Sequence, residues 1–169
     1  RIAVLGMAHD HLWGNLKSLA AQEDAELVAG ADYNPVLQKQ FTEKTGCGKI
    51  YDNYEELLDK ESPDAVYGFS ATALHAELVE LCAERGLHVM VEKPMAATLE
   101  QASRMLTAAR KAGTLLMINW PTAWSQVYRT AYRLTQEGAI GKLWQITWRG
   151  GHCGPDELGC SDEFCEFLF

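Results

Sequence analysis

The sequence lacks a long apolar run, a cluster of basic residues and an even set of cysteines. No stretch of its 169 residues approaches the roughly 20 apolar residues of a membrane-spanning helix, so we expect no membrane partner. With 15 basic and 23 acidic residues the net charge is -8, which argues against nucleic acid as a partner. Five scattered cysteines suit a reducing, cytoplasmic compartment better than a disulfide framework. What remains is a globular chain of ordinary composition.

Apolar segments of strand length alternate with segments of helical spacing along the first two thirds of the chain. We expect strands over residues 1–5, 26–31, 63–69, 87–91 and 114–118. Asn53 with Glu56, and Thr98 with Gln101, have the spacing of capping boxes and predict two helix starts. The alternation predicts an α/β fold over residues 1–119, a Rossmann-like doubly wound parallel sheet with helices on its faces.

The pattern changes after Asn119. Residues 124–134 have helical spacing, and 142–148 alternate so that their large apolar side chains share one face, which predicts a strand. That apolar face needs a cover, so we expect residues 120–169 to begin a second domain that contains more of the sheet.

Both ends of the sequence look cut. The chain begins at Arg1 directly on a predicted strand, without an initiator Met, and stops at Phe169 within an apolar aromatic stretch. We therefore expect it to be an incomplete stretch of a longer protein. A removed signal peptide would also explain Arg1.

A lysine follows one of the predicted strands directly, in the segment Val91-Glu92-Lys93-Pro94. Open α/β sheets bind ligands beyond the carboxyl ends of their strands, so Lys93 is expected to face that crevice. Pro94 restricts the preceding residue to extended conformations. A fixed ammonium can polarise a carbonyl or exchange a proton with a hydroxyl. The alternative is a surface lysine in a strand-to-helix turn.

A nucleotide-binding turn is expected after the first strand, although its glycine pattern is incomplete. Residues 6–11 occupy the place of G-x-G-x-x-G, but only Gly6 is kept, because Ala8 and His11 replace the other two glycines. Ala8 leaves room for a pyrophosphate, which a helix N-terminus attracts. Asp32 ends the second strand, where a carboxylate accepts hydrogen bonds from ribose hydroxyls. A plain strand-turn-helix remains the alternative.

Two groups of histidine and cysteine suggest metal ligands, and we expect a metal at neither. His9 and His11 are two residues apart, which suits one helical face poorly. The cysteines after His152 lack a C-x-x-C knuckle, so we interpret that segment as a loop that flanks the active site.

Taken in order, five short segments resemble the Gfo/Idh/MocA family of nicotinamide-dependent oxidoreductases. The resemblance runs from Arg1 to about Trp148. It rests on the glycine turn, Asp32 followed by Asn34-Pro35, Ser70 to His75, Glu92-Lys93-Pro94, and Gly138 to Lys142. In that family the segment that matches Ser70 to His75 usually reads Thr-Pro-Asn-x-x-His and lies along the cofactor. Because its first three residues differ here, backbone contacts carry over better than side-chain contacts.

The resemblance implies a nicotinamide cofactor and assigns roles to residues of this chain. It implies that Lys93 is catalytic, orienting or protonating the substrate, and that Glu92 lies by the nicotinamide ribose. We expect NAD, with NADP less favoured, because Asp32 would repel a 2′-phosphate. The family's second catalytic element, an Asp and a His of the C-terminal domain, is not in this sequence. The residues expected along the cofactor are Gly6, Ala8, His9, His11, Asp32, Ser70, Ala71, Thr72, His75, Glu92, Lys93 and Asn119.

The expected function is hydride transfer between a nicotinamide cofactor and a secondary alcohol or carbonyl of a sugar, polyol or related small hydroxy compound. Trp120 and His152 are the expected substrate contacts. Two alternatives stay open: a non-catalytic metabolite sensor of the same fold, and transient oxidation that drives elimination or glycoside cleavage. Retention of Lys93 favours an enzyme. The resemblance also implies that residues 120–169 begin an α+β domain with a largely antiparallel sheet, used for substrate binding and oligomerisation. It implies that the complete protein is a homo-oligomer.

Overall fold

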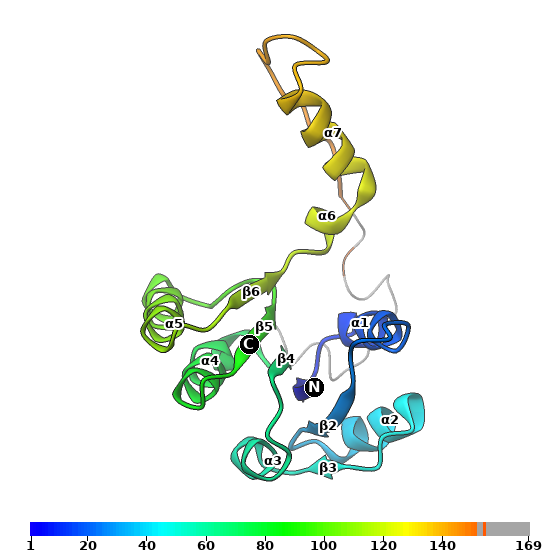
Figure 1. Cartoon of the computed structure of the whole chain (residues 1–169), viewed down its shortest axis with the longest axis vertical. Helices are drawn as coiled ribbons and strands as arrows, with labels where there is room; N and C mark the ends of the chain where they lie inside the picture. Colours follow the sequence, from blue (N-terminus) through cyan, green and yellow to red (C-terminus); the bar gives the residue numbers. More distant parts are fainter. Residues whose placement is uncertain (152–153, 155–169) are drawn as a thin grey trace. The chain divides into compact units, whose positions relative to one another are not determined.

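The computed structural model describes residues 1–151 and 154, which fall into two compact units (Figure 1). The described part of the first unit is Arg1–Asn119, and the second unit begins at Trp120. The candidate His152 and the three cysteines after it lie outside the described residues. None of the helices in the described ranges is long and apolar enough to cross a membrane.

The first unit is built on one six-stranded sheet in which every neighbouring pair is parallel. The strand order is β3-β2-β1-β4-β5-β6, so the direction of winding reverses between β1 and β4. Ligands of such sheets bind beyond the carboxyl ends of the strands at this reversal. The predicted doubly wound sheet is confirmed. Its strands are β1 Ile2–Met7, β2 Leu27–Ala31, β3 Ile50–Tyr51, β4 Ala65–Phe69, β5 His88–Glu92 and β6 Leu116–Asn119.

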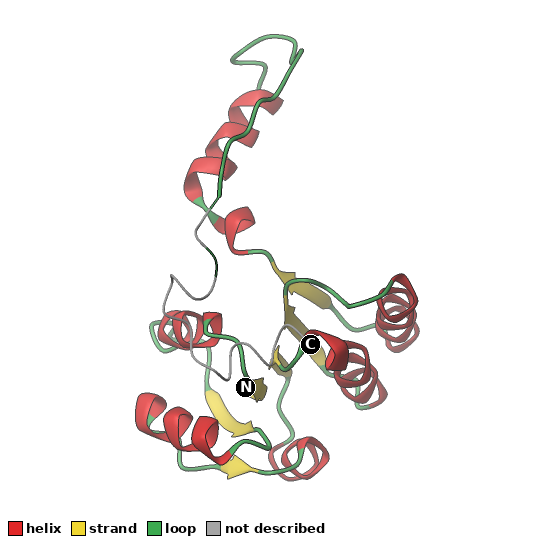
Figure 2. Ribbon diagram, turned by 180° about the vertical axis from the view of Figure 1, so that it is seen from behind, coloured by secondary structure: helices red, strands yellow, loops and turns green. Residues whose placement is uncertain are grey.

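Helices cover both faces of this sheet (Figures 1 and 2). The first two helices pack on one face, where Leu12, Leu16 and Phe41 form part of a buried core cluster. The next three pack on the other face, around Leu57 and Met105. The helices are α1 His11–Leu19, α2 Pro35–Thr45, α3 Tyr54–Glu61, α4 His75–Glu84 after the short 3₁₀ helix η1 Thr72–Leu74, and α5 Leu99–Ala112.

Side-chain caps fix where two of these helices begin. Asn53 Oδ1 accepts a hydrogen bond from the Glu56 amide at 2.8 Å, and Thr98 Oγ1 accepts one from the Gln101 amide at 3.2 Å. Caps of this kind stabilise a helix by about 1 kcal/mol each. Both helix starts that the capping-box spacing predicts are therefore confirmed.

The second unit agrees with its prediction in one element and differs in another: a helix lies where one was expected over residues 124–134, but the expected strand is absent. Its described helices are α6 Pro121–Trp124 and α7 Gln126–Gln136, neither of which has a buried residue. The predicted strand over 142–148 is wrong for this structure: these residues form no strand, and Trp144 is 87% exposed. A strand exists only beside a hydrogen-bonded neighbour, and no described segment pairs with this one. The antiparallel sheet of the second domain stays a prediction.

Candidate active site

The carboxyl end of β1, where Gly6 lies, packs closely against Ser70, the residue that follows β4. Gly6 has φ of 76°, and a Cβ there would lie 2.5 Å from the Ser70 backbone nitrogen, so only glycine fits without displacement. The Ala8 amide donates to the Phe69 carbonyl at 3.1 Å. Gly6 therefore allows the end of β1 to lie close to Ser70, at the point where the direction of winding of the sheet reverses.

Asp32 lies at the carboxyl end of β2 with its carboxylate fixed by backbone donors. Its side chain accepts the Met7 amide at 2.6 Å on Oδ2 and the Asn34 amide at 2.8 Å on Oδ1. A carboxylate at the end of the second strand of such a sheet accepts hydrogen bonds from ribose hydroxyls. The next residue, Tyr33, is 64% exposed, and its ring centroid lies 5.2 Å from that of Tyr54. This edge fits the adenosine half of a dinucleotide.

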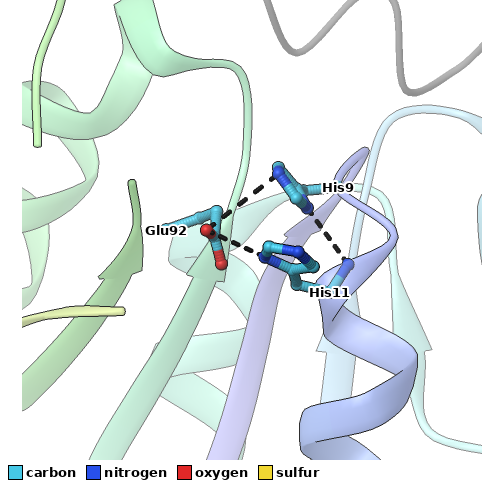
Figure 3. Close-up of side chains that lie close together, drawn as sticks. All are labelled: His9, His11 and Glu92. Atoms are coloured by element: carbon cyan, nitrogen blue, oxygen red, sulfur yellow. Dashed lines mark hydrogen bonds and ion pairs between the residues drawn. The ribbon is translucent and has the colours of Figure 1, made fainter. Parts of the chain in front are cut away.

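Two histidines of the turn meet a carboxylate of β5 (Figure 3). Glu92 is fully buried, and its Oε1 lies 3.1 Å from His11 Nδ1 and 4.0 Å from His9 Nε2. Asn119, at the end of β6, donates to Glu92 Oε2 at 2.7 Å. The ends of β5 and β6 and the start of α1 are thus joined through one carboxylate.

Burial and hydrogen bonding set the charges of this group. Desolvation lowers the pKa of His9 to about 3 despite the nearby Glu92, so His9 is neutral at ordinary pH. Burial raises the pKa of the Glu92 carboxyl, whereas hydrogen bonds from His11 and Asn119 lower it, and the net shift is downward. Glu92 is therefore an ionised, buried hydrogen-bond acceptor.

The ligand atoms of His9, His11 and Glu92 lie within 4.8 Å of one another, close enough to surround a metal ion. The spacing argument against this pair rests on a shared helix, but His9 precedes α1, which begins at His11. The hydrogen bonds give a better argument. His9 Nδ1 accepts the His11 amide at 3.0 Å, so in the neutral ring the proton is on Nε2, the nitrogen that a metal would need. This tautomer favours hydrogen bonding over metal binding.

The segment from Ser70 to His75 is held by its own histidine. His75 is fully buried, with Nε2 3.2 Å from the Ser70 carbonyl oxygen and Nδ1 3.2 Å from that of Met95. Burial lowers the pKa of His75. Ser70 and Thr72 are also buried, and Ala71 is half-buried. His75 thus fixes the loops after β4 and β5, and it would influence a cofactor through their position.

The other candidates lie at the same edge or in the second unit. Lys93 is half-buried, its bond to Pro94 is cis, and its charge contributes to lowering the pKa of His9. Asn119 is buried beside Glu92. Trp120 is 50% exposed and belongs to the second unit. Sequence reasoning missed the bonds from His11 and Asn119 to Glu92. The bond from Asn119 could have been expected, because Glu92 and Asn119 end neighbouring strands of the sheet.

Comparison with known proteins identifies the family. A family model described as "Oxidoreductase family, NAD-binding Rossmann fold" (GFO_IDH_MocA) matches residues 1–120. A dTDP-3,4-didehydro-2,6-dideoxy-alpha-D-glucose 3-reductase from Actinomadura kijaniata is 35% identical over 144 residues, covering 85% of this chain and 43% of the reductase. A myo-inositol 2-dehydrogenase from Thermotoga maritima is 30% identical, over 84% of this chain and 42% of its own length.

Solved structures agree with these relatives. A crystal structure of a mutant 3-ketoreductase from Actinomadura kijaniata, in complex with TDP-benzene and NADP, superposes with a TM-score of 0.72 at 34% identity. The match covers 84% of this chain and 43% of the ketoreductase. The chain thus spans less than half the length of the relatives that it matches. From the match over residues 1–120 and the strand order, the chain belongs to the Gfo/Idh/MocA oxidoreductase family, through its NAD-binding Rossmann domain.

Proposed function

We propose that the complete protein transfers a hydride between NAD and a secondary alcohol or carbonyl of a sugar, polyol or related hydroxy compound. One observation carries the proposal: the Gly6 turn, Asp32 and Glu92-Lys93 all lie at the carboxyl ends of strands of one parallel sheet. A dinucleotide in the crevice at this edge would have its adenosine ribose by Asp32 and its nicotinamide toward β5.

The names of the relatives support the substrate class. The reductase from Actinomadura kijaniata acts on a nucleotide-linked didehydro sugar, and the enzyme from Thermotoga maritima acts on a cyclic polyol. Both names describe chemistry at a ring carbon that carries a hydroxyl or keto group. We extend that class, and no single substrate, to this protein.

We assign some residues of the site to cofactor binding and one to catalysis. Asp32 would accept the ribose hydroxyls, and the turn around Gly6 and Ala8 would receive the pyrophosphate. Bound NAD supplies the hydride acceptor. The Lys93 ammonium would polarise the substrate oxygen, because it follows β5 directly at the edge of the crevice. A cytoplasmic location and a homo-oligomeric state belong to the same proposal, and the free thiols of Cys47 and Cys82 are consistent with a reducing compartment.

The test uses the full-length protein, NADH titration and a panel of sugars and polyols with cofactor absorbance as the readout. Lys93→Met keeps the apolar stem of the side chain and removes its charge, so turnover should fall at least about 100-fold while NADH binding and thermal stability change little. Lys111→Met, on α5, is the matched control.

Retained turnover in Lys93→Met would show that the lysine has no catalytic role. Tight NADH binding without turnover of any compound on the panel would favour the metabolite sensor. Release of a cleaved or dehydrated product without net NADH formation would favour the alternative in which oxidation is transient.

A further inference from the structure

The backbone amides at the start of α1 already donate hydrogen bonds within the turn. The His11 amide donates to His9 Nδ1 at 3.0 Å, and the Leu12 amide donates to the His9 carbonyl at 3.0 Å. The Trp13 amide donates to the Asp10 carbonyl at 3.2 Å. In a glycine-rich turn, the amides at this end of the helix point at the pyrophosphate of the dinucleotide. Because the first three amides of α1 are used here, a pyrophosphate would need a further donor.

Negative charge around the turn increases this need. Glu92 is fully buried and ionised, and Asp10 directly precedes α1. Both phosphates of the dinucleotide are also negatively charged, and like charges repel more strongly where water is excluded. The Lys93 ammonium lies at the same edge, but the proposed function assigns it to the substrate oxygen. A second cation near the turn would therefore favour cofactor binding.

His11 is the one residue of the His9, His11 and Glu92 group whose side chain is well exposed. Its side chain is 41% exposed, against 2% for His9 and 0% for Glu92. Ionised Glu92 can only accept, so His11 Nδ1, 3.1 Å from Oε1, carries a proton. No hydrogen bond between residues that the structure describes involves His11 Nε2. Figure 3 shows the His11 ring beside Glu92, at the start of α1. A protonated Nε2 would thus be available to a ligand while Nδ1 stays on Glu92.

We propose that His11 takes up a proton when the dinucleotide binds, and that its imidazolium then donates from Nε2 to the pyrophosphate. This proposal rests on the proposed function. Solvent supplies the proton, which returns to solvent when the cofactor leaves. No covalent bond of cofactor or substrate breaks in this step, so the proton is separate from the one that hydride transfer releases. His11 would supply the donor and the charge that the amides of α1 do not.

The groups that face His11 determine how readily it is protonated. Glu92 on β5 favours the imidazolium, and so does Asp10 in the turn. The Lys93 ammonium after β5 and the amino end of α1 oppose it. His9 is neutral, because burial lowers its pKa to about 3, so it does not titrate in the range of an ordinary histidine. The bound pyrophosphate adds negative charge and shifts the balance toward the imidazolium, so NADH affinity should fall as the pH rises from about 6.5 to about 8.5.

The first experiment counts protons by titration calorimetry. The full-length protein is titrated with NADH at about pH 8, in buffers that differ in ionisation enthalpy, and we expect uptake of about half a proton or more per NADH. ADP-ribose keeps the pyrophosphate and lacks the nicotinamide, so it should cause the same uptake. No uptake with either ligand would overturn the proposal, and so would uptake with NADH alone, which would place the proton at the nicotinamide end.

The second experiment uses two variants of His11. His11→Gln can donate to Glu92 but cannot take up a proton, so uptake should vanish and NADH should bind about tenfold more weakly at about pH 6.5. His11→Arg is charged at every pH of the experiment, and its guanidinium has donors for both Glu92 and a phosphate. Its NADH affinity should not change with pH, and it should match that of the unmodified protein at about pH 6.5. The control is His88→Gln, an exposed histidine at the start of β5, which should leave uptake and affinity unchanged.

The outcomes separate this inference from the proposed function. Proton uptake that persists in His11→Gln, or in His11→Arg if the first variant does not fold, would assign the proton to another group and refute the inference. NADH binding that does not depend on pH in the unmodified protein would also refute it. Neither result affects the oxidoreductase, which is tested by turnover and by Lys93→Met. If the unmodified protein binds no NADH, the proposed function fails and the inference fails with it.

Discussion

At the scale of single residues, the site depends on where protons are held. A carboxylate at a strand end was expected from the sequence, and so was a lysine beside it. The position of His9 before α1 was not expected. The spacing argument against a joint role of His9 and His11 holds only if both residues lie in the helix, and His9 does not. The tautomers of His9 and His11 are set by a backbone amide and by a carboxylate 81 residues away. Such long-range partners leave no periodic signal in a single sequence.

Asp32 should decide the choice of cofactor. We expect NADH to bind at least about tenfold more tightly than NADPH, a difference of about 1.4 kcal/mol, because the carboxylate repels a 2′-phosphate. Neither Tyr33 nor Asn34, the next residues, supplies a cation. Asp32→Ser should reduce the difference in affinity between NADH and NADPH. The control Asp52→Ser removes an exposed carboxylate after β3 and should leave this difference unchanged. Fluorescence titration with both cofactors is the measurement, and equal or tighter NADPH binding to the unmodified protein contradicts the prediction.

His9 should make stability depend on pH. Burial lowers its pKa from 6.5 to about 3 in the folded protein, so below pH 6.5 the unfolded chain binds a proton that the folded chain does not. The free energy of unfolding is therefore independent of His9 above pH 6.5. It decreases as the pH falls from 6.5 toward 3, by up to about 1.4 kcal/mol per pH unit.

The comparison is with His9→Asn, which can still accept the His11 amide but does not titrate. Urea unfolding at neutral pH and at about pH 4.5 should show roughly 2 to 3 kcal/mol less acid destabilisation in the variant. His75 titrates in both proteins, so its effect cancels. Identical pH dependence would mean that His9 is protonated in the folded protein as readily as in water.

At the scale of elements, strands with buried apolar runs could be predicted to within a few residues. The expected segments at 87–91 and 114–118 became β5 and β6. Two elements show the limits of local pattern. β3 is only two residues long, too short for any periodicity, and it pairs with β2 through Gly30 and Ala31. The segment 142–148 has the alternation of a strand but no hydrogen-bonded neighbour among the described residues.

Two glycines, one near the end of β1 and one at the end of α2, offer a matched pair of substitutions. Gly6 and Gly46 have φ of 76° and 70°, but a Cβ at Gly46 meets nothing within 4 Å. Gly46→Ala should therefore cost only the conformational term, about 1 to 2 kcal/mol. Gly6→Ala should cost clearly more and weaken NADH binding, because the new methyl collides with the Ser70 backbone. Thermal unfolding of both variants checks this, and equal losses of stability would show that the end of β1 can move away from Ser70.

At the scale of the whole molecule, the two units are unequal in their packing. The first has a buried core on both faces of its sheet, whereas helices α6 and α7 of the second bury no residue. Large apolar side chains of the second unit are exposed in the described structure, among them Val127 at 74% and Ile146 at 76%. Exposed apolar groups of this size favour association with other surfaces.

We therefore expect the 169-residue chain to self-associate and to bind a hydrophobic dye, and a shorter chain ending at Asn119 to do so much less. Size-exclusion chromatography at several concentrations, with dye fluorescence, compares the two. Neither chain should catalyse hydride transfer, because each spans less than half the length of the enzymes that it matches. A 169-residue chain that elutes as a clean monomer and turns over a sugar would contradict both expectations.

The bond between Asn119 and Glu92 has a consequence for how the protein is made. Synthesis runs from the amino end, so Glu92 leaves the ribosome 27 residues before the asparagine that satisfies its second oxygen. A buried carboxylate oxygen without a hydrogen-bond donor is unfavourable. In a growing chain that ends before β6, Glu92 would therefore stay in contact with water, and the end of β5 would not pack fully. The cofactor site would thus be the last part of the nucleotide-binding unit to mature, after the sheet around β1 has already formed.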